Sequence, residues 1–227
     1  MQSLFFDPFG WIPAKEYVLI TTKMKHLFLL LFLFVNVNLQ AQTKFKIVES
    51  DGEDALITYT FVDENDQTLK ILDSQKYYTA FYDLDYGHFA VVGIKGSPGW
   101  FAIDVHENVL FRVYNTSFGE PSPDYLIENK IRIIDNNEKI GFANEKGKII
   151  IKPQFELASS FHNGYAIIAE NCNKTPWPGH ENCDCHHYSM ECKKHGYIDE
   201  KGNIIKFGDY TVDQIIDEIG WQPDQQY

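Results

Sequence analysis

The residues best suited to chemistry in this 227-residue chain lie within residues 171–194 and directly after them. Cysteines and histidines are interleaved there: Cys172, His180, Cys183, Cys185, His186, His187, Cys192 and His195. Thiolates and imidazoles at short spacing bind zinc or copper, whereas an even number of cysteines in an exported chain is typical of disulfide bonds. The segment therefore has two competing interpretations.

The spacing favours disulfides over a metal site. The run Cys183-Asp-Cys185-His186-His187 lacks the Cys-x-x-Cys pair of most zinc sites. We expect two disulfides whose pairing the sequence leaves open. A Cys183–Cys185 bridge is disfavoured, because alternate residues of an extended chain point to opposite faces. The alternative is a metal site at Cys183, Cys185, His186 and His187.

A loop pinned by disulfides would display the aromatic and imidazole side chains between them. The candidates for this binding surface are Trp177, His180, His186, His187 and Tyr188. Pro176, Pro178 and Gly179 predict irregular backbone in the same stretch. Ordered insertions in repeat proteins often bind partners, so we expect another protein or a cell-surface polymer to bind here. A purely structural loop is the alternative.

No catalytic signature accompanies this segment. The Gly-x-Ser-x-Gly, His-Glu-x-x-His and P-loop patterns are all missing from the sequence. Acidic residues gather in turn-like stretches such as 63–66 and 135–138, where solvated turns explain them. We therefore expect a protein that is not an enzyme and that carries no cofactor.

Composition and charge narrow the class of protein further. The chain has 20 Lys and Arg against 32 Asp and Glu, a formal net charge of -12, and 44% hydrophobic residues. This is the composition of a folded globular protein. The excess of carboxylates argues against nucleic-acid binding, because backbone phosphates must be met by Lys and Arg.

Residues 24–41 have the plan of a secretory signal peptide. A short basic region begins at Met24, an apolar run covers residues 27–35, and Ala41 offers a small residue before Gln42. The run is shorter than the roughly 20 residues of a membrane-spanning helix, so we expect no membrane span in the mature chain. We expect export to the periplasm or the cell exterior.

Residues 1–23 fit this plan poorly. They carry Asp7 and Glu16 and contain two prolines, although a signal peptide begins with a short basic region. We interpret them as an over-extended start. The ending Leu39-Gln40-Ala41, followed by Gln42, resembles signal peptides of Bacteroidetes-type bacteria.

Short β-like runs make up most of the chain beyond residue 42. We expect strands within residues 55–62, 68–72, 89–94, 100–104, 109–113, 130–134, 139–144, 148–151, 165–169 and 196–199. Near the C-terminus, Thr211 and Gln214 have capping-box spacing, apolar residues follow at helical intervals, and Gly220 ends the run. The sequence thus predicts an all-β fold, an antiparallel β-hairpin repeat array with one short C-terminal helix.

Two stretches of the chain repeat one another closely. Residues 141–150 and 196–205 align without gaps, with six identical residues in ten, and residues 100–110 form a weaker copy. Such self-similarity is typical of stacked supersecondary units. In each unit a strand, a Glu-Lys-Gly turn and a pair of isoleucines would form a hairpin. We expect a hydrophobic face made of Phe142, Ile149, Ile150, Ala166, Ile167, Ile204 and Ile205.

Glycines occupy the positions of this hairpin that other residues would fill poorly. Gly147 and Gly202 lie where a short turn requires positive φ. Gly141 and Gly196 lie where a neighbouring backbone can approach closely.

The copies resemble the WG-repeat family, also called KWG repeats. Its units read Trp-Gly-aromatic-aliphatic-Asp, a turn with Gly, and paired aliphatics. The link from residues 151–155 to Asn163-Gly164-Tyr165-Ala166 fits the same pattern, while Ile140 and His195 stand where the family has Trp. The resemblance covers residues 78–206, with an insertion at 171–194. It implies a β-rich repeat array that binds or scaffolds and brings no catalytic residues.

The flanks of the array complete the expected organisation. Residues 42–77 would form an N-terminal β cap and residues 207–227 a C-terminal helical cap, because repeat arrays need capped ends. We expect an exported, non-catalytic repeat protein that binds or scaffolds through its β-repeat surface and its disulfide-pinned loop. The alternative is a periplasmic metal-binding protein that uses the Cys/His cluster 172–195.

Overall fold

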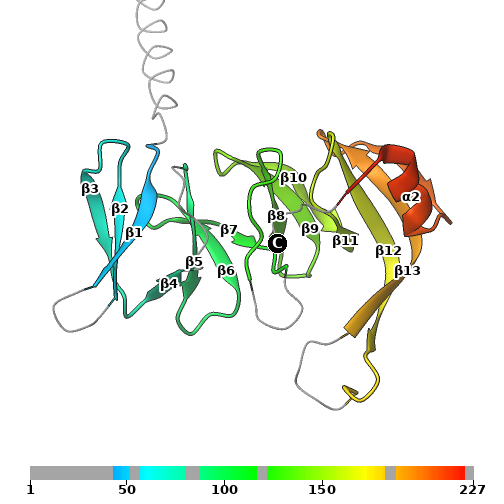
Figure 1. The fold of residues 1–227 in the computed structure, drawn as a ribbon, viewed down its shortest axis with the longest axis horizontal. Coiled ribbons are helices and arrows are strands. Elements are labelled where there is room, and N and C mark those ends of the chain that lie inside the picture. The colour runs from blue at the N-terminus through cyan, green and yellow to red at the C-terminus, as the bar shows by residue number, and fades with distance from the viewer. Residues whose placement is uncertain (1–42, 52–56, 80–86, 117–121, 182–187, 223–227) are drawn as a thin grey trace, which may run out of the picture. The chain divides into compact units, whose positions relative to one another are not determined.

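The computed structural model describes residues 43–51, 57–79, 87–116, 122–181 and 188–222. Within these ranges the chain is built almost entirely of antiparallel strands, with one short helix near the C-terminus (Figure 1). The predicted all-β fold is confirmed. Among the described residues, no helix is both long enough and apolar enough to cross a membrane.

The strands form three sheets. The first is three-stranded, in the order β1 (Lys46–Asp51), β2 (Ile57–Val62), β3 (Thr68–Leu72). The second contains β4 (Tyr77–Thr79), β5 (Ala90–Ile94), β6 (Trp100–Ile103), β7 (Val109–Val113), β8 (Lys130–Ile134), β9 (Ile140–Asn144) and β10 (Ile149–Phe155). Each strand of this sheet pairs with the next in sequence, as stacked hairpins require.

The third sheet supports the C-terminal helix. Its strands are β11 (Leu157–Ala158), β12 (Tyr165–Pro176), β13 (Tyr188–Asp199) and β14 (Ile204–Gly208), and the helix is α2 (Val212–Ile219). The expected capping box is present, because the Thr211 side chain accepts from the Gln214 N–H and the Gln214 side chain accepts from the Thr211 N–H. Gly220 ends the helix with a φ of 62°.

The same polar turn closes five hairpins. Its first residue is Asp63, Asp104, Asp135, Asn144 or Asp199, and the side-chain oxygen accepts from the N–H groups two and four residues later, at 2.8–3.1 Å. The fourth residue has positive φ: Asp66, Glu107, Glu138, Gly147 or Gly202. The Asx side chain is therefore the common feature of these turns, and glycine fills the strained position in two of them.

Gly141 and Gly196 permit close approach of two strands. A Cβ added at Gly141 would lie 2.5 Å from the carbonyl oxygen of Ile151, and one added at Gly196 would lie 2.0 Å from that of Lys206. Both distances are far below van der Waals contact, and the obstructing atoms are backbone. The two equivalent glycines therefore set how tightly β9 and β13 pack against the strands that follow them.

Alternate residues of the inner strands supply successive hydrophobic clusters. On β5, Val91 belongs to one cluster, while Ala90 and Val92 belong to another. On β9, Ala143 belongs to one cluster and Phe142 to another. Because successive side chains of a strand point to opposite faces, these strands are buried on both sides and link neighbouring hairpins.

The expected hydrophobic face is only partly correct. Phe142, Ala166 and Ile167 are buried. The isoleucine pairs are exposed instead, at 42% for Ile149, 38% for Ile150, 58% for Ile204 and 52% for Ile205. They directly follow the turns and lie on β10 and β14, each of which is the edge strand of its sheet. Register shifts along β10 turn the later residues, Ile151 and Phe155, toward the core.

Candidate functional site

The hairpin formed by β12 and β13 extends beyond the strands beside it. β11 pairs with β12 only as far as Ala169, and β14 pairs with β13 only from His195 onward. Beyond that point the two strands pair with each other alone, up to Pro176 opposite Tyr188. We call the described residues of this extension, 170–181 and 188–194, the arm. A two-stranded ribbon by itself is marginally stable in water, so the arm needs other support.

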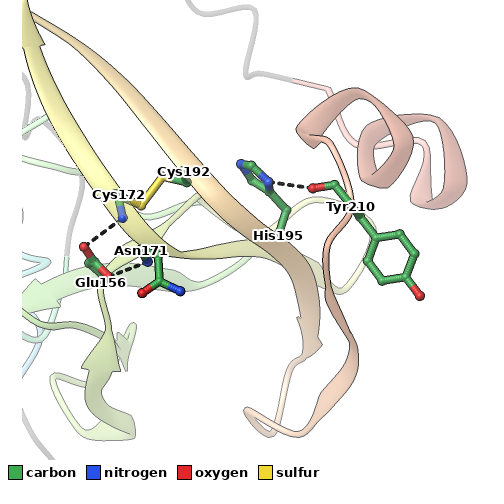
Figure 2. The surroundings of a disulfide bond; sticks show 6 residues. All are labelled: Glu156, Asn171, Cys172, Cys192, His195 and Tyr210. Carbon is green, nitrogen blue, oxygen red and sulfur yellow. Dashed lines mark hydrogen bonds between the residues drawn. A yellow bond between two sulfur atoms is a disulfide. The ribbon is translucent and has the colours of Figure 1, made fainter.

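A disulfide supplies part of that support. Cys172 of β12 and Cys192 of β13 are register partners, and their sulfur atoms are bonded (Figure 2). The bridge lies just past the last residues that the neighbouring strands cover. One of the expected disulfides is therefore present, and its pairing is settled. Cys183 and Cys185 lie outside the described residues.

Glu156 supports the same part of the arm from the side. Its two carboxylate oxygens accept from the backbone N–H groups of Asn171, at 2.9 Å, and Cys172, at 3.1 Å (Figure 2). Asn171 has a φ of 56°, a left-handed conformation that interrupts the regular ribbon. The carboxylate thus satisfies two N–H groups at the point where the ladder is distorted.

His195 lies at the base of the arm. Its Nδ1 is 2.8 Å from the carbonyl oxygen of Tyr210 (Figure 2). A carbonyl oxygen only accepts, so we assign the proton to Nδ1, which leaves Nε2 as the acceptor in the neutral ring. This hydrogen bond therefore fastens the segment before α2 to β13.

An apolar groove of about 230 Å³ lies between the base of the arm and α2. The arm contributes Met190 and Cys192, the helix contributes Val212 and Ile216, and Trp221 lines the groove beyond the helix. The Trp221 indole N–H donates to the carbonyl oxygen of Ser160 at 3.0 Å, which fixes the ring in place. The floor of the groove comes from β11, β12 and the residue after β11: Leu157, Ser159, Ile167, Ile168 and Ala169.

The ribbon is distorted where the arm contributes to the groove. Cys192 and His195 are three residues apart on β13, and both line the groove. In a regular strand that spacing would place them on opposite faces. Asn171 on the partner strand has a left-handed conformation at this point, where the ribbon departs from regular strand geometry.

Polar contacts hold α2 against the third sheet. The Tyr197 hydroxyl donates to Glu218 at 3.1 Å, and Lys206 also bonds that carboxylate. The hydrogen bond from Lys206 holds the pKa of Glu218 below its ordinary value, and burial together with Glu218 raises the pKa of Tyr197. This contact fixes the helix that forms one wall of the groove.

The structure places some of the other predicted binding residues on the arm. Trp177 is 43% exposed, and its indole N–H donates to the Ser189 hydroxyl at 3.1 Å. The His180 backbone N–H donates to the carbonyl oxygen of Trp177 in a turn. The backbone of Tyr188 pairs opposite Pro176. His186 and His187 lie outside the described residues.

The arm is more regular than the sequence suggested. Pro176, Pro178 and Gly179 led us to expect irregular backbone across the insertion. Paired strand instead continues to Pro176 and resumes at Tyr188. The irregular part of the described arm begins only after Pro176, because a proline ring removes the N–H that would extend the ladder.

The metal alternative finds no support among the described residues. No group of three or more His, Cys, Asp or Glu side chains in those ranges could hold a metal ion. The proposed ligands Cys183, Cys185, His186 and His187 lie outside those ranges, so the metal site there stays a prediction.

Sequence reasoning missed three residues of this site. Trp221 could have been found, because an apolar residue after a glycine cap commonly packs back on the last helical turn. Met190 offered no signal beyond its apolar character. Glu156 offered none either, since the N–H groups that it accepts from lie 15 and 16 residues further along the chain.

Comparison with known proteins supports the repeat interpretation over part of the chain. Residues 140–171 match the family model described as WG containing repeat. The match begins with β9 and ends at Asn171, the second residue of the arm. Neither the curated proteins nor the solved structures give a match to this chain.

Proposed function

We propose that this chain is an exported, non-catalytic repeat protein that binds its partner through the arm and the adjoining β surface. The observation that carries this proposal is the disulfide between Cys172 and Cys192, placed where the ribbon leaves its sheet. Most side chains of the arm are exposed and add little to the hydrophobic clusters. A segment held in a fixed shape without serving the core is best explained by recognition.

Export is the part of this proposal that the disulfide supports chemically. Disulfides persist in oxidising compartments and are rare where glutathione and thioredoxin keep thiols reduced. Residues 24–41 have the plan of a signal peptide, which agrees with export. Their ending adds to the proposal that the protein is of a Bacteroidetes type. The partner, another protein or a cell-surface polymer, would then be met in the periplasm or outside the cell.

Two clusters of charged side chains among the described residues, around Glu107 and around Arg132, join parts of the fold, and this structural role accounts for their perturbed pKa values without a catalytic one. Glu107 accepts from Lys70, Lys76 and Tyr77, and these bonds, with that from Lys70 the largest contribution, lower its pKa to about 2. Arg132 bonds the buried Asp124 and the carbonyl oxygen of Ala158. Burial lowers the pKa of Arg132, and Asp124 more than reverses this effect.

An arm-deletion variant tests the proposal. Glu170 and Lys194 are register partners, so residues 171–193 can be replaced by an Asn-Gly turn that closes the hairpin at its base. We expect the labelled variant to bind the cell-envelope fraction of its source organism at least about tenfold more weakly than the wild type. The matched control is Asn136→Ala, a change in the exposed turn between β8 and β9.

Two further readouts decide the outcome. Circular dichroism should show that the variant keeps the β spectrum of the wild type, so that lost binding reflects the arm and not unfolding. Unchanged binding by a folded variant would overturn the arm as the recognition element. The wild-type chain, recovered from outside the cytoplasm, should begin at Gln42, and recovery only from the cytoplasm would overturn export.

A further inference from the structure

The groove between the arm and α2 is large enough for one or two side chains of a ligand, but small for a whole small-molecule ligand. Its volume of about 230 Å³ falls below the roughly 300–1,000 Å³ of typical small-molecule sites. Its lining is mainly aliphatic and aromatic, with the Met190 thioether and the disulfide sulfur on the arm side. Such a lining favours a large apolar side chain, because burying it there removes apolar surface from water.

The helix makes one rim of this groove acidic. Val212 and Ile216 line the groove, and each residue of a helix is turned by about 100° from the one before it. Asp213 and Asp217 therefore form the next stripe on the groove side of α2. Both are exposed, and among the described residues neither forms an ion pair with a basic side chain. Glu218 lies on the opposite side, where Lys206 bonds it.

Among the described residues that line the groove, none is a lysine or an arginine. Cys192 and His195 line it, whereas Lys193 and Lys194, between them, do not. Lys194 is the register partner of Glu170, so these opposite charges lie side by side across the ribbon. A ligand in the groove would thus meet apolar walls and, along α2, two carboxylates.

We propose that this groove binds a peptide segment of a partner protein in which one large apolar side chain is flanked by Lys or Arg. The apolar side chain would enter between Met190 and Trp221, and the flanking cations would lie against Asp213 and Asp217. The inference rests on the proposed binding function and names the chemistry of its partner. A second copy of this chain is disfavoured because it would bring the same acidic rim against itself, and an anionic membrane would be repelled.

Met190 provides a direct probe of the groove. The chain contains three methionines, and Met190 is the one that lines the groove. In full-length protein labelled with ¹³C at the methionine methyl groups, Met190→Leu assigns its resonance. Three synthetic peptides serve as ligands: one Phe flanked by Lys, one Phe flanked by Glu, and one Ser flanked by Lys. We expect the Met190 resonance to shift with the first peptide and not with the third.

Charge variants test the acidic rim. We expect Asp213→Asn/Asp217→Asn to bind the Lys-flanked Phe peptide about three- to tenfold more weakly than the wild type. The matched control is Glu64→Gln/Glu138→Gln, which removes the same charge from two exposed turns and should leave binding unchanged. Val212→Phe should fill the groove and abolish the shift of the Met190 resonance.

The outcomes separate this inference from the proposed function. Equal binding of the Lys-flanked and Glu-flanked Phe peptides would overturn the basic partner. Binding that survives Val212→Phe would overturn the groove as the site. If no peptide shifts the Met190 resonance while the wild type still binds the envelope fraction through its arm, this inference fails and the proposed function stands.

Discussion

The β9–β10 hairpin and the arm are both antiparallel pairs, yet different forces hold them. β9 is buried on both faces, with Phe142 at 1% exposure and Ala143 at 0%. The arm has exposed side chains on most of its length, and a disulfide and the Glu156 carboxylate hold it instead. Packing stabilises an element that stays inside an array, whereas a covalent link keeps its shape where no neighbour covers it.

The largest effect should come from breaking the array at its buried ion pair. Asp124 is 3% exposed and accepts from the backbone, Nε and Nη2 of Arg132. Asp124→Ala would leave a buried guanidinium without its counter-charge, at a cost of about 3–5 kcal/mol in the free energy of unfolding. Urea unfolding followed by circular dichroism measures this loss.

The control for this prediction keeps hydrogen-bond acceptors at the site. Asp124→Asn should lose less stability than Asp124→Ala, because its amide oxygen can still accept from Arg132. Both variants should keep the disulfide of the arm. A loss below about 1 kcal/mol for Asp124→Ala would contradict the structural role of the pair.

Breaking the arm should have a smaller and local effect. In Cys172→Ser/Cys192→Ser, we expect amide hydrogens of Lys174 and Met190 to exchange faster, by the equivalent of about 2–4 kcal/mol in opening free energy. Amides of β5 and β9 should be unaffected. Hydrogen exchange with mass spectrometry measures both regions in one sample, and an equal increase in both would show that the arm and the array unfold together.

Acid should weaken the array and leave the covalent link of the arm intact. Glu107 has a pKa of about 2 in the folded chain, below its ordinary 4.5, chiefly because Lys70 bonds it. A lowered folded pKa stabilises the protein above the ordinary value, and this contribution disappears as pH falls from about 4.5 toward 2. We expect a loss on the order of 1–2 kcal/mol between these limits, which Glu107→Gln should remove. The disulfide does not titrate, so the arm should remain linked.

Thermal unfolding of the wild type and Glu107→Gln from pH 6 to pH 2.5 tests this difference. Parallel curves for the two proteins would assign the acid response to other carboxylates, such as Asp104 and Asp199. Burial raises the pKa of Asp104, and hydrogen bonds that include the one from Asn108 more than reverse this effect. The hydrogen bond from Asn203 is the main cause that lowers the pKa of Asp199.

Local patterns predicted much of the array. Alternating apolar residues and the Glu-Lys-Gly turns located the hairpins from β9 onward, and the capping box located α2. The paired isoleucines misled, because apolar character alone does not reveal an edge strand or the register shifts along β10. The turns at Asp63 and Asp135 lack the glycine that identified the Glu-Lys-Gly turns in the sequence. What they have in common with those turns is the side-chain contact of the first residue, Asp or Asn, which only the structure shows.

The site was harder to predict, because its parts meet through tertiary contacts. The cysteine count indicated disulfides, but only the register of β12 and β13 pairs Cys172 with Cys192. Met190 and Trp221 share a groove although they lie on different elements, and Glu156 reaches the arm from before β11. No spacing in the sequence encodes these contacts.

The most direct test of the account is a disulfide map of the protein purified from its source organism, with free thiols alkylated and metal content measured on the same sample. The account predicts a chain that begins at Gln42, contains a peptide pair joined through Cys172 and Cys192, and holds no zinc or copper. Alkylated thiols at both Cys172 and Cys192, with about one zinc or copper per chain, would contradict it and would make the Cys/His cluster 172–195 a metal site.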